Sequence, residues 1–337
     1  MAIAGSTYNK HMQKVALIAG ITGQDGSYLS RFLLQKGYKV IGLVRSYTQS
    51  NIKNLTYLGI HNEIVFHDCD LTDISQLIKI IGLYKPDEIY NLAAQSSVSL
   101  SFNQPIGTIQ FNVLSVLNFL EAIKILNAGN TTRFYQASSS EMFGKVDVLP
   151  IREHTVFHPL SPYAISKATG HWLTVNYRES YGMYAACGIL FNHESYLRSD
   201  NFFSKKIIRE SLRIRHGLQD SLHVGNIDIK RDFGYAVKYV EAMWLMLNQD
   251  KPEDYIICSG TSVSLRSIIY HVFDRLNISR EKIIPDPTLY RPTDISDILG
   301  DNSKAKRNLN WEYDMSFYEV LDLLVEEEER NKTYQNI

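Results

Sequence analysis

The sequence predicts an α/β protein in which a doubly wound parallel sheet carries a smaller, interleaved C-terminal α/β domain. Two observations lead to this fold class: short apolar strands alternate with helices over the first half of the chain, and a glycine-rich turn follows the first strand. Parallel strands need covering crossovers, so the alternation implies helices on both faces of the sheet. A chain of 337 residues is long enough for both parts.

The first repeat of this pattern lies at the N-terminal end. Val15–Ala19 is a short apolar run, and residues 26–36 carry Leu29, Phe32 and Leu33 at helical spacing, which makes a strand followed by a helix. The same reasoning predicts later elements. Strands are expected near residues 40–44, 64–67, 88–92, 134–137 and 184–189, and helices near residues 74–83 and 108–126.

After about residue 192 the alternation gives way to short mixed segments with amphipathic helices near residues 202–216 and 317–329. This change predicts a main domain over residues 13–191, with return segments near 228–262. Residues 192–330 are expected to form most of a cap over the carboxyl ends of the strands.

The N-terminal segment, residues 1–12, lacks the apolar stretch of a signal peptide and is expected to be a disordered leader.

Composition excludes several classes of function. The formal net charge of −1 gives no positive field for nucleic acid, and no window of about 18 uninterrupted apolar residues is present to span a membrane. Cys69, Cys187 and Cys258 are far apart and lack metal-ligand spacing, which is typical of reduced core thiols in a cytoplasmic protein without a metal.

The turn after the first strand reads Gly20-Ile21-Thr22-Gly23-Gln24-Asp25-Gly26. Glycines here permit a tight turn and a close approach of the backbone, so that a pyrophosphate can bind the free amides of the following helix. The alternative is a glycine turn without a ligand. The position favours a Rossmann-type dinucleotide site, with candidate cofactor residues Gly20, Thr22, Gly23, Gln24, Asp25 and Gly26.

The end of the second strand bears on the choice of dinucleotide. Where an acidic residue would hold the ribose of NAD, the chain has Arg45, Ser46 and Thr48, which suit a 2′-phosphate and favour NADP over NAD. Arg45 could equally be a solvated loop charge. Beyond the third strand, Asp70 is a candidate acceptor for the adenine amino group, although a helix-capping role competes with this interpretation.

A tyrosine and a lysine four residues apart form the predicted chemical centre. Tyr163 and Lys167 share one face of the helix that Ser161-Pro162 introduces. A neighbouring ammonium favours the phenolate, so we expect Lys167 to lower the pKa of Tyr163 and make it a usable base. Ser139, at the end of a serine-rich strand, can hydrogen-bond the hydroxyl that the tyrosine deprotonates.

These features together resemble the extended short-chain dehydrogenase/reductases. The resemblance rests on residues 20–26, on Asn91-Leu92-Ala93-Ala94-Gln95-Ser96, on Ser139 and on the pair of Tyr163 with Lys167. It implies that further residues hold the cofactor or face the substrate. The additional cofactor residues are Leu71, Leu92, Ala93 and Gln95, and Ser96 lies on the substrate side.

Glu141 narrows the reaction that we expect. An enzyme that only transferred hydride at C4 of a sugar ring would need no carboxylate at position 141. Once C4 of a sugar is a ketone, its C5 hydrogen is acidic, and a glutamate can remove it while the C6 hydroxyl leaves as water. Return of the hydride to C6 then gives a 4-keto-6-deoxy sugar without net use of cofactor. The alternative is that Glu141 only caps the following turn.

From about residue 14 to 311 the sequence resembles more closely the GDP-mannose 4,6-dehydratase family. The strings that carry this resemblance run over residues 20–29, 133–138, 174–182, 188–195 and 225–232. The resemblance implies a GDP-sugar substrate, a homodimer or homotetramer, and a diphosphate held by cations and an amide. The implied substrate residues are Asn192, Lys206, Arg231 and Arg291.

A few positions depart from the family pattern on the substrate side. Ser139 stands where the pattern has threonine, Leu160 where it has arginine, Tyr196 where it has proline, and Ser296 where it has glutamate. These changes leave open the same chemistry on another GDP-hexose or a GDP-heptose. A 4-epimerase or 4-ketoreductase is a further alternative, which the Glu141 carboxylate disfavours.

Overall fold

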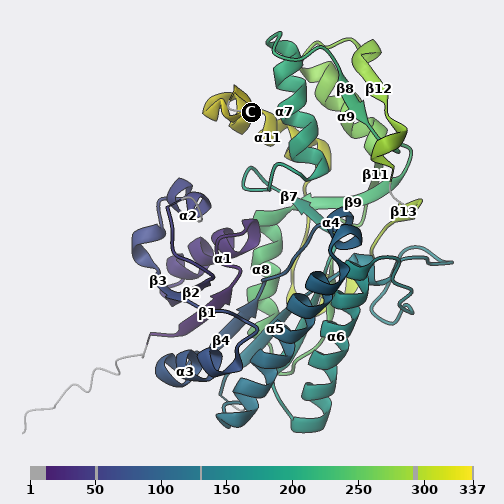
Figure 1. Cartoon of the computed structure of the whole chain (residues 1–337). Coiled ribbons are helices and arrows are strands. Elements are labelled where there is room, and N and C mark those ends of the chain that lie inside the picture. The colour runs from purple at the N-terminus through teal and green to yellow at the C-terminus, as the bar shows by residue number, and fades with distance from the viewer. Residues whose placement is uncertain (1–12, 50–51, 130, 291–294, 336–337) are drawn as a thin grey trace, which may run out of the picture.

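The computed structural model describes residues 13–49, 52–129, 131–290 and 295–335. The expected leader, residues 1–12, and the candidate Arg291 lie outside these ranges. The predicted fold class is confirmed: a parallel sheet with helices on both faces carries a smaller unit at one end (Figure 1).

The main sheet has seven parallel strands in the order β10-β6-β5-β4-β1-β2-β3. Its order reverses between β1 and β4, which is the place where doubly wound sheets bind ligands. The strands are β1 (Val15–Ala19), β2 (Lys39–Val44), β3 (Val65–Asp68), β4 (Glu88–Asn91), β5 (Arg133–Ser139), β6 (Ala185–Leu190) and β10 (Tyr255–Ile257).

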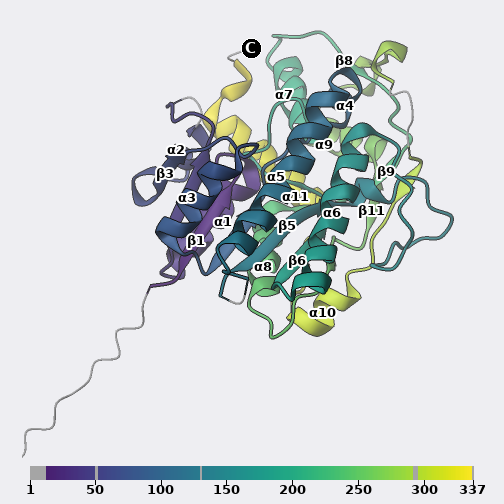
Figure 2. The same cartoon turned by 60° about the horizontal axis from the view of Figure 1, so that its bottom comes forward.

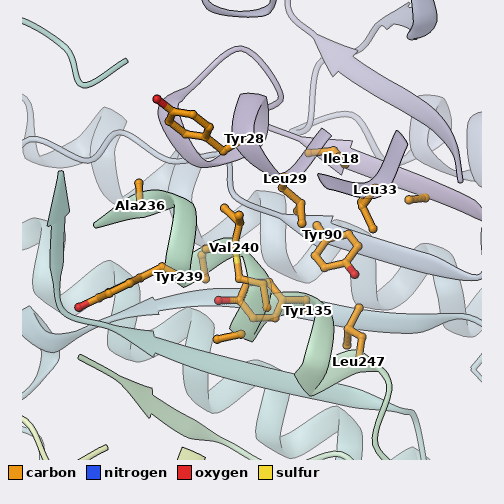
Figure 3. Packing of buried hydrophobic residues seen from close by; sticks show 14 of the residues in the cluster. Ile18, Tyr28, Leu29, Leu33, Tyr90, Tyr135, Ala236, Tyr239, Val240 and Leu247 are labelled. Carbon is orange, nitrogen blue, oxygen red and sulfur yellow. The ribbon is translucent and has the colours of Figure 1, made fainter. Parts of the chain in front are cut away.

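Alternation along β1 explains why this strand is buried on both sides. Ala16 and Ile18 belong to one hydrophobic cluster, while Leu17 and Ala19 belong to another on the opposite face. Successive side chains of a strand point to opposite faces, so an almost wholly apolar strand fits a sheet covered by two layers of helices. Figure 3 shows the first of these clusters, in which side chains of the sheet meet those of α1 and α8.

The helices divide between the two faces. α1 packs against α8 on one face, whereas α5 lies between α3 and α6 on the other (Figures 1 and 2). The helices of this part are α1 (Gln24–Gln35), α2 (Lys53–Tyr57), α3 (Ile74–Tyr84), α4 (Val98–Asn103), α5 (Pro105–Ile125), α6 (Pro162–Tyr181), α8 (Ala236–Leu247) and α10 (Ser303–Leu309).

Helix α5 is the one helix of the described residues that is long and apolar enough to cross a membrane. Its side chains Phe119, Leu120 and Ile123 are buried against the sheet and α3, which accounts for the apolar composition as core packing. Helices of a protein interior are often hydrophobic over most of their surface.

The smaller unit contains two further sheets and its own hydrophobic cluster. One sheet runs β11-β9-β13 with β7 also paired to β9, and the other joins β8 to β12. The strands are β7 (Asn192–Glu194), β8 (Leu222–Val224), β9 (Lys230–Tyr235), β11 (Ser262–Ser264), β12 (Ile283–Pro285) and β13 (Asp297–Ile298), and the helices are α7 (Phe203–Arg215), α9 (Leu265–Arg275) and α11 (Phe317–Asn331).

The segment 228–262 was expected to return to the main sheet, and it does so only in part. Helix α8 packs on α1, and β10 pairs with β6 as the last strand of the main sheet. Strand β9, however, belongs to the smaller sheet, where it pairs with β7, β11 and β13. The residue pattern of a single strand does not specify which of two sheets the strand joins.

An ion pair fixes α6, the helix that carries Tyr163, to the segment before β10. Arg178 donates from both terminal nitrogens to the Asp254 carboxylate, at 2.8 and 2.7 Å, and each side chain is only 17% exposed. Asp254 also accepts the backbone N–H of Cys187 at 3.0 Å. This two-pronged geometry is the strongest form of an arginine–carboxylate contact.

Breaking this pair is expected to destabilise the protein. Asp254→Asn leaves the Arg178 charge without its partner, so urea denaturation should show a loss of about 3 kcal/mol in the free energy of unfolding. The control is Asp274→Asn, which removes a pair with Arg280 in which both side chains are more than half exposed and should therefore cost much less. Equal losses in the two variants would contradict the argument.

Candidate active site

The glycine turn between β1 and α1 is tight enough to require glycine. Gly20 has φ +78°, and a Cβ there would lie 2.8 Å from the backbone nitrogen of Ala93. A Cβ on Gly26 would lie 2.3 Å from the carbonyl oxygen of Gly20. Gly23 is the N-cap of α1 and makes no side-chain cap, so the first amides of the helix are available to an anion.

One cavity, of about 660 Å³, extends from this turn over the ends of β2, β3 and β4. It has the shape expected for the adenosine half of a dinucleotide at the switch point of the sheet. Arg45 lies at its edge and is exposed. The predicted cofactor residues that line it are Gly20, Thr22, Gly23, Arg45, Leu71, Leu92, Ala93 and Gln95.

Asp70 does not line this cavity or the smaller one that adjoins it. Its carboxylate accepts the backbone N–H of Thr72 at 2.9 Å and the hydroxyl of Thr72 at 2.7 Å, and the side chain is exposed. Asp73 is the N-cap of α3. The helix-capping role therefore belongs to Asp73, whereas Asp70 forms a turn with Thr72, because short acidic side chains readily bond the backbone two residues on.

A second cavity, of about 340 Å³, adjoins the first through Gly20, Gly23, Leu92 and Ala94. It lies between the carboxyl ends of the main strands and the smaller unit. The predicted residues that line it are Gln24, Asp25, Gly26, Ser96, Ser139, Glu141, Tyr163, Lys167, Asn192 and Arg231.

Tyr163 and Lys167 project from one face of α6, as their spacing predicts, and both are buried. Ser161 caps the helix by accepting the N–H of Ala164 at 3.1 Å, and Pro162 occupies its first turn. The Lys167 ammonium donates to the carbonyl of Ala137 at 2.8 Å and lies 5.9 Å from the centre of the Tyr163 ring.

The expectation that Lys167 lowers the pKa of Tyr163 is wrong for this structure. Burial raises the pKa of Tyr163 to about 12, and a hydrogen bond with Ser139 offsets only part of this rise. Lys167 is directed toward Ala137 rather than the phenol, and burial lowers its own pKa to about 8. Desolvation by burial is the largest influence on the pKa of each group.

Ser139 and Glu141 lie where β5 ends and a short 3₁₀ helix, Ser140–Met142, begins. The Ser139 hydroxyl accepts the backbone N–H of Glu141 at 3.2 Å and is also hydrogen-bonded to Tyr163. The Glu141 carboxylate is only partly buried in the cavity wall, and its charge raises the pKa of Tyr163.

On the opposite wall, Arg231 comes from β9 and is buried with its guanidinium donating to the carbonyls of Lys230 and Ile295, at 2.7 and 2.6 Å. Asn192 begins β7 beside it. Lys206 is different: it lies outside both cavities, 3.7 Å from Glu210. The structure thus places Asn192 and Arg231 at the site and not Lys206.

Comparison with known proteins decides the family. The family model for GDP-mannose 4,6 dehydratase matches residues 17–324. GDP-mannose 4,6 dehydratase 1 of Arabidopsis thaliana is 45% identical over 325 residues, covering 94% of this chain and 90% of its own. The enzyme of Vibrio cholerae is 41% identical over 350 residues, covering 94% of each. The chain belongs to the GDP-mannose 4,6-dehydratase family.

Solved structures agree with this family at the level of the fold. UDP-glucose 4-epimerase of Thermotoga maritima superposes with a TM-score of 0.84 at 23% identity, over 94% of this chain and 99% of its own. The dTDP-glucose 4,6-dehydratase DesIV of Streptomyces venezuelae, solved with NAD, also gives 0.84, at 21% identity over 95% and 98% of the two chains.

This family member carries cavity residues for which the sequence predicted no role. The segment after β7 supplies Arg198, Asn201 and Phe202, and β7 itself supplies His193. His193 lies within a string that marks the family, yet its partner is 168 residues away in the chain. A single sequence carries no signal for a contact at that separation.

Of the positions at which this dehydratase sequence departs from the family pattern, Ser139 lines the smaller cavity, whereas Leu160, Tyr196 and Ser296 lie outside both cavities. Tyr196 packs against Tyr57 of α2 with tilted rings whose centres are 4.8 Å apart. The carbonyl of Ser296 accepts the N–H of Lys230 at 2.8 Å. These positions therefore contribute to the framework around the site and do not line it.

Proposed function

We propose that the chain is an NADP-dependent hydro-lyase that converts GDP-mannose to GDP-4-keto-6-deoxymannose by internal transfer of hydride from C4 to C6 with loss of water. The observation that carries this is Glu141 in the same cavity as Ser139, Tyr163 and Lys167. A carboxylate beside the groups that oxidise C4 can remove the C5 proton in an elimination, whereas epimerisation at C4 does not need a carboxylate at this place.

Each of the four side chains has a distinct task in this proposal. Tyr163 takes the proton of the C4 hydroxyl, which Ser139 orients, and Lys167 fixes the local geometry through Ala137. Glu141 removes the C5 proton and donates it to the departing C6 hydroxyl, which leaves as water; when the hydride returns to C6, a proton returns to C5. A bound nicotinamide would supply the hydride acceptor for C4 and the hydride donor for C6. The positive charge of the oxidised nicotinamide would favour the phenolate form of Tyr163.

The cofactor is proposed to be NADP, held along the 660 Å³ cavity with its pyrophosphate on the first amides of α1. Arg45 is placed for a 2′-phosphate, because it is the cation among the residues that line this cavity in the described part of the chain. A guanidinium binds phosphate oxygens in a two-pronged geometry.

Arg45→Ala is expected to weaken NADP binding by about tenfold or more, because one charge-assisted contact with the 2′-phosphate is lost. NAD binding should be nearly unchanged. Titration of the purified protein with each dinucleotide measures both values. Lys39→Ala at the start of β2 is the matched control, because its cation packs on Tyr84, away from the cavity. A parallel loss for NAD and NADP in Arg45→Ala would contradict the assignment.

The substrate is proposed to be a GDP-sugar bound by Ser96, Asn192 and Arg231, with Lys206 and Arg291 as candidates carried by the family resemblance alone. A GDP-hexose other than mannose or a GDP-heptose is the second candidate, which Leu160, Tyr196 and Ser296 support less now that they lie outside the cavities. Incubation with a panel of nucleotide sugars, followed by mass spectrometry for loss of water, tests this. A C4 epimer of unchanged mass would refute the dehydratase assignment.

The protein is further proposed to be a cytoplasmic homodimer or homotetramer. Support comes from an apolar outward face on α5 and α6, where Ile106 is 80%, Trp172 59% and Ile165 45% exposed. Large apolar side chains gathered on one face of a protein mark an interaction surface.

A further inference from the structure

A histidine and an aspartate meet in the wall of the active-site cavity, where β7 of the smaller unit touches the start of α1. His193 Nε2 lies 2.9 Å from each carboxylate oxygen of Asp25. His193 is buried and stacks on Tyr239 with ring centres 4.6 Å apart. The contact adds a charged pair to the neutral hydrogen bonds that Gln24 makes with the His193 carbonyl and with Ser195.

The hydrogen bonds of this histidine identify its charge. Nδ1 lies 2.7 Å from the carbonyl of Phe191, and Nε2 faces the Asp25 carboxylate. Both partners can only accept, so both ring nitrogens donate and the ring is an imidazolium. Although burial alone would lower it, the Asp25 carboxylate holds the pKa of His193 above its ordinary value.

A negative charge on Asp25 with no positive charge beside it would be unfavourable at two places, the cofactor site and the phenol of Tyr163. It lies in the first turn of α1, beside the amides proposed to bind the pyrophosphate. Its charge also raises the pKa of Tyr163 and of Lys167. An uncompensated carboxylate would repel the dinucleotide and disfavour the phenolate.

We propose that His193 is the internal counter-ion of Asp25, which offsets the charge of this carboxylate at a bound dinucleotide and at the phenol of Tyr163. The effect on the dinucleotide needs only the cofactor site, whereas the effect on Tyr163 rests on the proposed function. His193 acts through Asp25 and is a positioning residue.

The other charged groups around the pair do not replace His193 in this role. Arg198 also acts on Asp25 and on the histidine, but its own charge is paired with Glu194 at 3.4 Å. Lys167 is held by Ala137. The remaining groups that interact with Asp25 electrostatically are the buried phenols Tyr135, Tyr163 and Tyr239, which are neutral near pH 7.

The first test measures dinucleotide affinity by titration calorimetry with NADP. His193→Gln should weaken binding by about tenfold or more, since one unit charge a few ångströms away is worth this much at an effective dielectric constant of about 20. The double variant His193→Gln/Asp25→Asn carries no charge to compensate and should recover most of that loss. A double variant that binds no better than His193→Gln would overturn the proposal.

A matched control separates charge from packing. Ser195 donates to Gln24 at 2.7 Å and so joins the same two segments without any charge. Asp25→Asn should give no gain in affinity when it is added to Ser195→Ala, whereas it should in the His193→Gln background. An equal gain in both backgrounds would mean that Asp25 is unfavourable whether or not His193 is present, and would refute compensation.

The second test is the pH profile of kcat. Asp25 raises the pKa of Tyr163 even with His193 in place. Loss of the histidine charge should raise it further, so the acid limb of the profile should move to higher pH in His193→Gln and return in the double variant. An unmoved limb in His193→Gln overturns the part of the proposal that concerns Tyr163. If every variant lacks activity while the affinities follow the predicted pattern, the proposed reaction fails and the charge compensation stands.

Discussion

Glu141→Gln is expected to retain oxidation at C4 but to lose dehydration, with kcat for the 4-keto-6-deoxy product reduced by about 10²- to 10⁴-fold. The amide keeps the size and hydrogen bonding of the side chain but cannot accept the C5 proton. Because hydride is taken from C4 but not returned to C6, reduced nicotinamide should accumulate during a single turnover, which its absorbance reports. Exchange of the C5 hydrogen with solvent deuterium should disappear at the same time.

Removal of this carboxylate also removes a negative charge near Tyr163, so the pKa of the phenol should fall and C4 oxidation should not slow. Glu179→Gln, on the exposed side of α6, is the control for a change of glutamate to glutamine on the same part of the molecule. Dehydration at the wild-type rate in Glu141→Gln would show that another group removes the C5 proton.

Tyr163→Phe is expected to lose both oxidation and dehydration, with kcat lower by about 10²- to 10⁴-fold and the affinity for nucleotide sugar nearly unchanged. The phenol is buried and hydrogen-bonded to Ser139, so it is placed to act on one hydroxyl and contributes little to binding elsewhere. In contrast to Glu141→Gln, no reduced nicotinamide should form. Tyr181→Phe, at the exposed end of the same helix, should keep full activity.

Much of the framework could be predicted because its signals are local. The apolar run Val15–Ala19 became β1 without change, and the spacing of Tyr163 and Lys167 placed both on one buried face of α6. The first turn requires glycines because a Cβ there would clash with the backbone of the turn itself or with the neighbouring Leu92–Ala93 segment. In these cases the sequence pattern and the local geometry depend on the same few residues.

The parts that sequence reasoning did not predict depend on distant contacts or on burial. The pairing of Asp25 with His193 joins residues 168 positions apart, and the choice of the smaller sheet by β9 depends on its partners. Desolvation raised the pKa of Tyr163 where charge proximity alone predicted a decrease. Tertiary structure, which a single sequence does not display, decides each of these features.

The measurement that tests the central claim most directly follows one hydrogen atom. GDP-mannose deuterated at C4 is incubated with the protein and a catalytic amount of NADP, and the product is examined by NMR. The account predicts a 4-keto-6-deoxy sugar that carries the deuterium on C6, because the hydride taken from C4 is returned within the same cavity. Deuterium found on C4 of an inverted sugar, or a 4-keto-6-deoxy product without deuterium on C6, would contradict it.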